Sequence, residues 1–180
     1  MNPLTGLGAA TLAALVVTGC ALPISVTSYV ERGVDLSRYQ TFAWGKVDDQ
    51  PTGDPRLDSN AIFHERVRAE AERRLTRRGF LKVNADADIT VRYRIVVVDE
   101  IEDSTIDRVT GYCPQNDCAP FVFQSGTLAF VLADARTNRT LWRGWATGTV
   151  DGVVNDQKRL EEMVGDVVAR VFERLPAHAE

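Results

Sequence analysis

Apolar residues recur at helical spacing in two segments of the chain. In the first segment they fall every four residues, at Phe63, Val67, Ala71 and Leu75. A helix would bring these positions onto one face, because its period is about 3.6 residues. The stripe predicts a helix that is capped by Asp58 or Ser59 and stopped by Gly79, since aspartate and serine favour the N-cap and glycine favours the position after the last turn.

The second helical segment lies near the end of the chain. Its apolar stripe contains Leu160, Val164, Val167, Val171 and Leu175. This spacing predicts an amphipathic helix from about Asp156 to Leu175, which Pro176 ends.

Alternating apolar and polar residues predict a strand in ITVRYRIVVVDEIE, which begins at Ile89. The odd-numbered residues 89–97 are apolar and share one face, whereas Thr90, Arg92 and Arg94 lie on the other. This second face is therefore expected to be partly solvated near the start of the strand. Val96 and Val98 break the alternation, so the far end is expected to be covered on both sides.

Four further strands are predicted from shorter apolar runs, at 26–30, 41–44, 121–133 and 141–150. Gly126 lies inside the third of these and predicts a β-bulge there. Asn138 is expected to take a left-handed conformation in the turn between the last two strands. Trp142 and Trp145 lie three residues apart and are expected on opposite faces of the last strand.

These elements together predict the fold class. Strands joined by a tight turn pair antiparallel, and a helix with one apolar stripe must cover that stripe against another layer. We therefore expect a single α+β domain over residues 26–176, in which two amphipathic helices pack on one face of an antiparallel sheet of about four to six strands.

The N-terminal apolar run ends at a cysteine. Residues 4–17 are too short for a membrane-spanning helix, which needs about 20 apolar residues, and their length is typical of the core of a signal peptide. The next residues, Val17, Thr18, Gly19 and Cys20, resemble a bacterial lipobox. They predict a lipoprotein signal peptide over residues 1–19, a lipidated Cys20, and a short tether over residues 20–25.

Acyl chains on Cys20 would hold the protein to a lipid bilayer. Each buried methylene contributes about 0.8 kcal/mol, so two or more long chains such as palmitate make the anchor permanent. Ala21 stands where an aspartate commonly signals retention in the inner membrane, and this resemblance implies an outer-membrane lipoprotein that faces the periplasm. The alternative is a plain signal peptide in which Cys20 is incidental. No lysine or arginine precedes Arg32, whereas signal peptides usually begin with positive charge.

Lipidation of Cys20 would leave Cys113 and Cys118 as a pair, in the turn-rich stretch GYCPQNDCAP. Because the periplasm is oxidising, we predict a disulfide that closes this small loop. Half of a metal site is the alternative. No histidine lies near the two cysteines, since the chain contains only His64 and His178, and we expect no metal.

The overall composition limits the classes of ligand that the protein is expected to bind. The chain has 180 residues and a net charge of −4, which gives no reason to expect nucleic acid as a partner. No glycine-rich phosphate loop follows a predicted strand, so we expect no cofactor. Arginines crowd residues 73–78; the helix dipole accounts for cations at a helix C-terminus, and contact with lipid phosphates is the alternative.

Four stretches of the chain resemble one bacterial lipoprotein family. They are VDLSRYQTFAWG at 34–45, RRGF at 77–80, DADITVRYRI at 86–95 and GTLAFVLADARTNRTLWRGWATG at 126–148. The family is known as a domain of unknown function, DUF4136. The resemblance extends over residues 30–175 and implies an envelope lipoprotein with a compact α+β domain and no established activity. It implies no functional residues.

Candidate catalytic groups are few. A catalytic triad needs a histidine positioned by an acid, but His64 is expected on a polar helix face and His178 in a terminal tail, so both are interpreted as exposed bystanders. The acidic segment DEIEDSTID at 99–107 could supply the paired carboxylates of an envelope hydrolase. A solvated acidic loop is the simpler interpretation. We predict no catalytic residue.

The sequence therefore favours a non-enzymatic binding or scaffold module of the cell envelope. The constrained loop at 101–120 is the candidate surface for an envelope protein partner, through Tyr112, Asp103, Asp107 and Asp117. Two alternatives remain open. One is the hydrolase that uses the 99–107 carboxylates, and the other is a carrier of a small apolar ligand, which would need a cavity between sheet and helices. Trp44, Trp142 and Trp145 could stack on a sugar ring, although at least two of them are expected to pack in the core or on the sheet.

Overall fold

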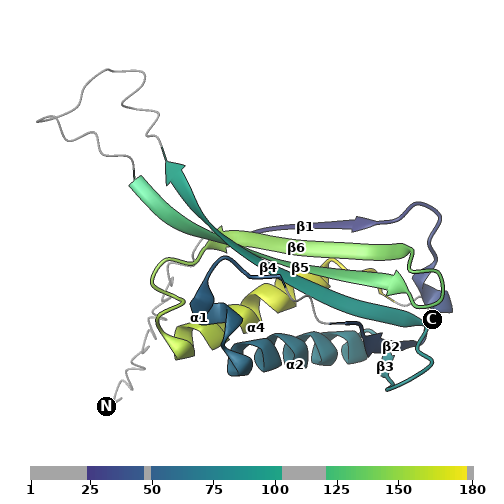
Figure 1. Cartoon of the computed structure of the whole chain (residues 1–180). Helices are drawn as coiled ribbons and strands as arrows, with labels where there is room; N and C mark the ends of the chain where they lie inside the picture. Colours follow the sequence, from purple (N-terminus) through teal and green to yellow (C-terminus); the bar gives the residue numbers. More distant parts are fainter. Residues whose placement is uncertain (1–23, 47–49, 103–120, 178–180) are drawn as a thin grey trace, which may run out of the picture.

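A six-stranded sheet forms one layer of the molecule, and helices form the other (Figure 1). The computed structural model describes residues 24–46, 50–102 and 121–177. The strands are β1 (Ile24–Val30), β2 (Thr41–Trp44), β3 (Leu81–Lys82), β4 (Ile89–Glu102), β5 (Phe121–Asp134) and β6 (Thr140–Thr149). The helices are the 3-10 turn η1 (Leu36–Arg38), the short α1 (Pro55–Asp58), and the long α2 (Ala61–Arg77) and α4 (Gln157–Glu173).

The sheet is mixed. Its strand order is β1-β6-β5-β4-β2-β3. The three pairs β1–β6, β6–β5 and β5–β4 are antiparallel. β2 instead pairs parallel with both β4 and β3. The α+β class and the strand number agree with the prediction, but a purely antiparallel sheet was wrong. The reason is that α2 follows β2 as a crossover, which returns the chain to the same end of the sheet before β3 begins.

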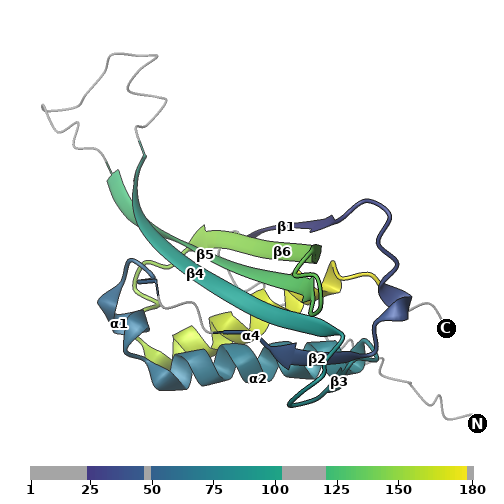
Figure 2. The ribbon, with the colours of Figure 1, turned by 45° about the vertical axis from the view of Figure 1, so that its right-hand side comes forward.

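Both long helices cover the same face of the sheet, as predicted (Figures 1 and 2). α4 packs beside α2 and contacts β6 and β1. An aromatic cluster joins the two layers, since the ring of Phe172 on α4 lies 4.9 Å from Phe130 and 5.7 Å from Trp142. Trp142 is fully buried in this core, whereas Trp145 lies on the opposite, helix-free face, as the sequence predicted.

Two of the four ends of the long helices lie where the sequence predicted them. Asp156 caps α4 by accepting the backbone N–H of Arg159, and Gly79 follows α2 at a φ of 93°. The cap of α2 was predicted wrongly, because Asn60 takes that role through the N–H of Phe63. Asp58 is not available as the cap, since it ends α1 and its carboxylate accepts the N–H of Thr52. α4 itself ends two residues before Leu175, at Glu173.

The arginines at the end of α2 have structural partners. Arg73 and Arg74 pair with Glu70, a buried acid on the same helix. Arg78 crosses to the end of α4, where its Nη1 donates to the carbonyl of Leu175 at 2.6 Å. These contacts agree with the helix-terminus interpretation of the 73–78 run, because the guanidinium of Arg78 satisfies a carbonyl that follows the last turn of α4.

Two details of the strands differ from the prediction. The register between β5 and β6 shifts at Leu132/Ala133 and is regular at Gly126, so the bulge is displaced. A Cβ at Gly126 would lie 2.6 Å from the side chain of Val150, and this close approach explains the glycine. The far end of β4 is not covered on both sides, since Val96 and Val98 are 36% and 47% exposed. The helices pack only on the other face, which leaves these valines in solvent.

Asn138 adopts the predicted left-handed conformation, with a φ of 57°, in the turn between β5 and β6.

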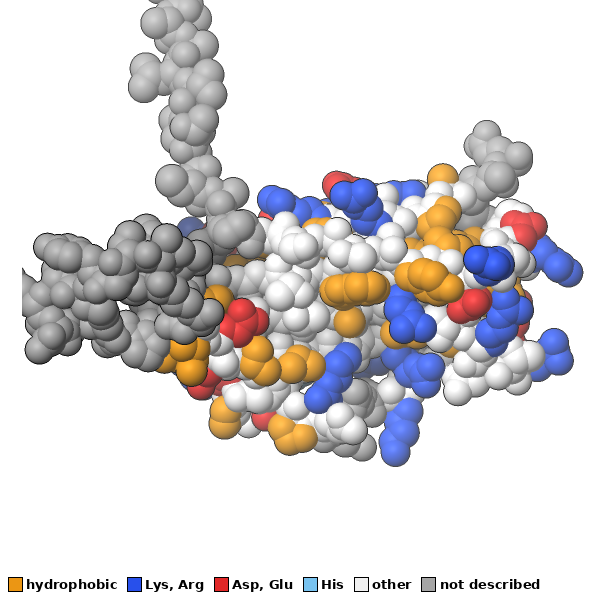
Figure 3. Space-filling model, turned by 90° about the horizontal axis from the view of Figure 1, so that it is seen from above, with side chains coloured by type: hydrophobic (Ala, Val, Ile, Leu, Met, Phe, Trp, Pro, Cys, Tyr) orange, Lys and Arg blue, Asp and Glu red, His pale blue; other side chains and the backbone are white. Residues whose placement is uncertain are grey.

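Apolar and basic side chains share the surface on the side of β1 and β6. Figure 3 shows the hydrophobic side chains there interspersed with lysines and arginines and with uncharged polar groups. The molecule therefore presents no single large apolar patch in that view.

Candidate functional site

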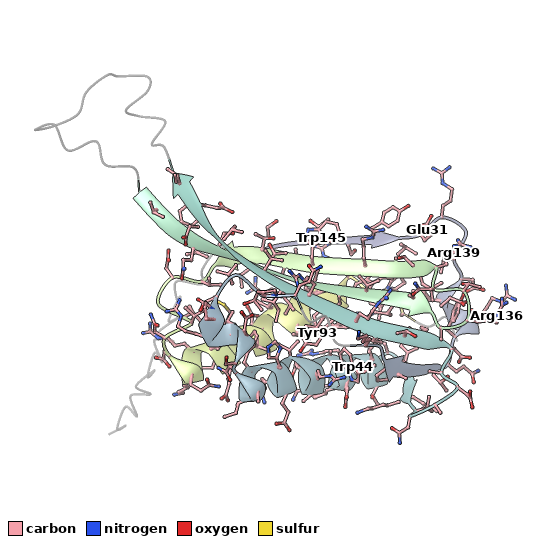
Figure 4. The ribbon with its side chains drawn as sticks, viewed as in Figure 1. Glu31, Trp44, Tyr93, Arg136, Arg139 and Trp145 are labelled. Atoms are coloured by element: carbon pink, nitrogen blue, oxygen red, sulfur yellow. The ribbon has the colours of Figure 1, made fainter. Side chains whose placement is uncertain are left out.

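A groove with a volume of about 910 Å³ lies between α2 and the edge of β4 that faces away from β5. We call it the edge groove. Trp44 and Tyr93 form part of its floor, α2 contributes His64 and Arg68, and the segment 50–52 forms its far wall. Figure 4 shows Trp44 and Tyr93 in the space between β4 and α2, with Trp145 on the other side of the sheet.

The edge groove exists because β2 is short. β2 pairs with β4 only through residues 89–91, and Gly45 then donates its N–H to the carbonyl of Val91 at 2.9 Å. The chain rejoins this edge at Thr52, whose carbonyl accepts the N–H of Val97 at 2.7 Å. In the described part of the chain, no strand pairs with Tyr93 or Ile95 along this edge.

Aromatic side chains fix the floor of the edge groove. The rings of Trp44 and Tyr93 meet edge to face, with centroids 5.9 Å apart. The guanidinium of Arg68 lies 4.8 Å from the centroid of Trp44, which is a favourable distance for a cation–π interaction. Trp44 therefore has one face covered by Arg68 and is held in a fixed orientation.

Hydrogen bonds determine the tautomer of His64. Its Nε2 lies 3.1 Å from the carbonyl oxygen of Leu57, and its Nδ1 lies 2.9 Å from the hydroxyl of Tyr93. A carbonyl can only accept, so Nε2 donates its N–H to Leu57, and in the neutral form of the ring Nδ1 accepts the Tyr93 O–H. Burial raises the pKa of Tyr93, against a smaller opposing effect of Arg68, which keeps the phenol protonated and able to donate.

Glu72 joins the tryptophan to the basic rim. Its carboxylate accepts the indole N–H of Trp44 at 2.7 Å and pairs with the ammonium of Lys82. Burial works to raise the pKa of Glu72, but the hydrogen bonds from Lys82 and Trp44 outweigh it, and the pKa lies below its ordinary value. Glu72 is therefore ionised at neutral pH and already engaged by two donors.

The charge balance of the edge groove differs from that of the whole chain. Its described lining contains five basic side chains, at Lys46, Arg68, Lys82, Arg92 and Arg94, and three acidic ones, at Asp58, Glu65 and Glu72. The chain overall carries a net charge of −4. One of these basic side chains has an unsatisfied hydrogen-bond donor: the buried Nε of Arg68 has no partner in the described structure. Among the described lining residues, this N–H is a donor that an anionic group could satisfy.

Most residues proposed from the sequence lie outside the described part of the chain. These are Cys20, Asp103, Asp107, Tyr112, Cys113, Asp117, Cys118 and His178. The lipidation, the disulfide and the partner surface of the 101–120 loop therefore stay predictions.

Two of the predicted carboxylates are described, and they do not converge. Asp99 and Glu100 are both exposed near the end of β4, and as successive residues of a strand they point to opposite faces. Asp99 accepts a hydrogen bond from Gln124 at 3.2 Å. Neither residue lines the edge groove, so this pair does not form the two-carboxylate arrangement of a hydrolase.

A small apolar crevice lies between the sheet and the helices. Its volume is about 70 Å³, and its lining includes Ile24, Phe63, Val97 and Val164. An apolar carrier would use a space of this kind, but ligand pockets usually measure hundreds of cubic ångströms. The crevice is too small for an acyl chain.

Sequence reasoning missed the edge groove and assigned His64 wrongly. His64 is half-buried and hydrogen-bonded rather than an exposed bystander. One signal was present: His64 and Arg68 stand four residues apart beside the apolar stripe of the same helix, which places both on one flank. Their partners Trp44 and Tyr93 come from distant strands, and no local pattern joins them to the helix.

In the described ranges, no helix is long and apolar enough to cross a membrane, and no cluster of His, Cys, Asp and Glu could hold a metal ion. One known protein family matches most of the chain. Residues 25–177 match the family model described as a domain of unknown function, DUF4136. The chain belongs to this family. This result agrees with the resemblance found in the sequence.

Two solved structures with TM-scores of 0.50 or more share the fold of this DUF4136 protein. A PDZ domain protein from Parabacteroides distasonis matches with a TM-score of 0.55 at 17% identity over 86% of this chain, which spans only 35% of that protein. A PelC dodecamer from Paraburkholderia phytofirmans matches with a TM-score of 0.50 at 16% identity, over 87% of this chain and 100% of PelC. A DUF4136 family protein from Bacteroides thetaiotaomicron has a TM-score of 0.47 at 13% identity, with coverage of 82% of this chain and 95% of that one. No curated protein matches significantly.

Proposed function

We propose that this DUF4136 protein is a lipid-anchored, periplasm-facing binding module of the bacterial envelope, and that the edge groove is its binding surface. The observation that carries the proposal is the combination of a groove of about 910 Å³ with a buried arginine N–H that has no hydrogen-bond partner among the described residues. Such groups are stabilised when a ligand supplies the missing hydrogen bonds. The lipobox at Cys20 supports the anchor.

The chemistry of the edge groove favours binding over catalysis. Both ring nitrogens of His64 are already engaged, so this histidine has no free atom with which to take a proton from a substrate. Lys82 pairs with Glu72, and Trp44 donates to the same carboxylate. These groups hold one another in place, as in a rigid recognition surface.

A photocrosslinking experiment in cells tests the binding role. A benzoylphenylalanine at Glu65, an exposed residue that lines the edge groove, is expected to capture an envelope partner. The matched control carries the crosslinker at Glu162, an exposed residue of α4. A third variant carries it at Tyr112 and tests the 101–120 loop as the alternative surface.

Three outcomes are distinguishable. A species captured from Glu65 and absent from Glu162 supports the edge groove as the binding surface. Capture from Tyr112 alone moves the binding role to the loop and overturns the assignment of the groove. Identical products from all three positions, or none, contradict a binding module with a defined surface.

A further inference from the structure

We propose that the helix-free face of β1, β6 and β5 lies against the phospholipid headgroups of the bilayer that holds the anchor. The face would bring two aromatic rings to the level of the headgroups and one arginine to a lipid phosphate. This inference rests on the lipid anchor of the proposed function and adds how the anchored body is oriented.

The face is a regular array of nine side chains that point away from the helices. Three rows cross the three strands, and the alternation of side chains along each strand determines which residues share the face. The rows are Tyr29–Arg143–Val131, Thr27–Trp145–Ala129 and Ser25–Thr147–Thr127. All nine residues are at least partly exposed, and Figure 3 looks onto this side of the sheet.

Charge is sparse on this face. Arg143 is the one charged residue among the nine, and its guanidinium lies 5.7 Å from the ring centroid of Tyr29. On the β4 side, hydrogen bonds to neutral oxygens hold the guanidiniums of Arg92 and Arg94. On the β1 side, Glu31 follows the strand and lies beyond the three rows. The charge that this face offers to a phosphate is therefore that of Arg143.

The helix layer on the other side of the molecule is more highly charged. α4 alone carries four acidic and three basic residues, which are Glu161, Glu162, Asp166, Glu173, Lys158, Arg159 and Arg170. Moving charges of both signs out of water costs free energy, and carboxylates are repelled by lipid phosphates. The helix-free face can therefore approach a bilayer at a lower desolvation cost than α4.

The residue types of the face match the chemistry of the headgroup region. Tyrosine and tryptophan are enriched at membrane–water interfaces, because one end of each ring system is apolar and the other is polar. Arginine pairs well with phosphate through its planar guanidinium. A sugar is the competing ligand for exposed aromatic rings, but Arg143 already lies over the ring of Tyr29. One of the two rings is thus not free to stack on a sugar.

The position of the anchor brings this face to the membrane. Cys20 precedes the first residue of β1, Ile24, by four residues, which span at most about 14 Å when extended. β1 is the border strand of the face, so the bilayer begins within this distance of its end. With the face on the lipid, the edge groove between β4 and α2 would be directed away from the bilayer and accessible to a partner.

Fluorescence quenching by brominated lipids tests this orientation. The chain contains three tryptophans: Trp142 is buried in the core, Trp44 lines the edge groove, and Trp145 lies on the proposed face (Figure 4). The native lipoprotein is reconstituted into vesicles of phosphatidylethanolamine and phosphatidylglycerol with bromine on the acyl chains near the headgroups. Bromine quenches tryptophan only at short range, and unbrominated vesicles provide the reference. The variants are Trp145→Phe and the matched control Trp44→Phe, and circular dichroism verifies that both are folded.

The expected result is quenching in the wild type and in Trp44→Phe, and its loss in Trp145→Phe. Arg143→Gln should lower the ratio of docked to undocked protein about fivefold, the scale of one basic side chain at an anionic membrane surface. Arg66→Gln changes an exposed arginine of α2 and should leave that ratio unchanged.

A crosslinker on the face gives a second readout that retains all three tryptophans. A benzoylphenylalanine at Thr27, an exposed residue of the array, is expected to form adducts with phospholipid that mass spectrometry detects. The same crosslinker at Glu162 on α4 should form none.

Several results would overturn the inference. Quenching that survives in Trp145→Phe and disappears in Trp44→Phe would place the groove side against the lipid. Capture of a second copy from Thr27, in place of phospholipid, would make the face a protein interface. If the protein enters the vesicles but none of its tryptophans is quenched, this inference fails and the anchor stands. If the protein purified from its host carries no acyl chain and stays out of the vesicles, the anchor of the proposed function itself fails.

Discussion

At the scale of single residues, one glycine controls the loop that borders the edge groove. Gly53 has a φ of +97°, and a Cβ at this position would lie 2.2 Å from the carbonyl oxygen of Val97. That carbonyl belongs to the backbone of β4 and has little freedom to move. Gly152 also has a positive φ, of +68°, but nothing lies within 4 Å of its Cβ position. Substitutions at the two glycines can therefore be compared to separate backbone strain, which is present at both, from steric overlap, which is present only at Gly53.

Gly53→Ala is expected to lower the free energy of unfolding by about 2–4 kcal/mol, because it adds a clash with backbone to an unfavourable φ. Gly152→Ala is expected to cost about 1 kcal/mol, from the left-handed conformation alone. Urea unfolding followed by tryptophan fluorescence measures both. Equal losses for the two variants would show that the loop at Gly53 moves away from β4 without difficulty.

At the scale of elements, Asp88 joins the start of β2 to the start of β4. Its Oδ2 accepts the backbone N–H groups of Gln40 and Thr41, each at 2.9 Å, and the hydroxyl of Thr41 at 2.8 Å. The bond from Gln40, followed by those from Thr41, lowers the pKa of Asp88 below its ordinary value. This carboxylate thus fixes the position of the parallel pair that makes the fold mixed.

The lowered pKa of Asp88 predicts a pH dependence of stability. A carboxyl whose pKa is lower in the folded state stabilises the fold above its unfolded pKa, about 4, and loses that contribution as the pH falls through the folded value. Asp88→Asn should therefore be less stable than wild type at pH 7, by about 1 kcal/mol for weakened hydrogen bonds. The difference should shrink steadily below about pH 4.

Urea unfolding of both proteins from pH 7 to pH 2 measures this effect. Asp134 also has a lowered pKa, caused first by the backbone N–H of Thr137. It titrates in both proteins, and its charge is the smallest of the influences on the pKa of Asp88, so the difference between the proteins reports mainly on Asp88. A difference that is constant across this range would contradict the assigned role of its charge.

At the scale of the whole molecule, the chain enters the sheet at one end, where Ile24 pairs with Gly148 and begins β1. The same row across the sheet runs through Gly126 to Val97, where the segment at Thr52 closes the edge groove. A lipid anchor at Cys20 would stand only four residues before this end of the sheet. At most about 3.6 Å per extended residue separates them, so the body would stay near the bilayer.

Cys20→Ala is expected to abolish palmitate labelling and to move the protein out of the membrane fraction, because the anchor depends on acyl chains. The thermal unfolding midpoint of the body should not change, since the described core begins at Ile24. Cys113→Ala serves as the control and should remain labelled and membrane-bound. Equal labelling of the wild type and Cys20→Ala would refute lipidation at this residue.

The sequence predicted those parts of the fold that depend on residues close together in the chain. The stripe at Phe63, Val67 and Leu75 located α2, and alternation from Ile89 located β4 and its buried face. The order of β2, β3 and β4 was not accessible, because parallel pairing depends on how α2 packs across the sheet and not on the strand sequences. The cap at Asn60 was missed for a related reason: Asp58 accepts a bond from Thr52, outside the helix.

The candidate site depends even more strongly on contacts between residues that are distant in the chain. His64 meets a tyrosine 29 positions away, and Trp44 meets a glutamate 28 positions away. No periodicity spans such separations. The sequence by itself determined which segments form helices and strands and which face each one buries, because those properties repeat at the period of the backbone. Only the tertiary structure decided that β2 ends early beside α2 and that a groove forms there, because a groove is defined by the distance between elements that the chain brings together only on folding.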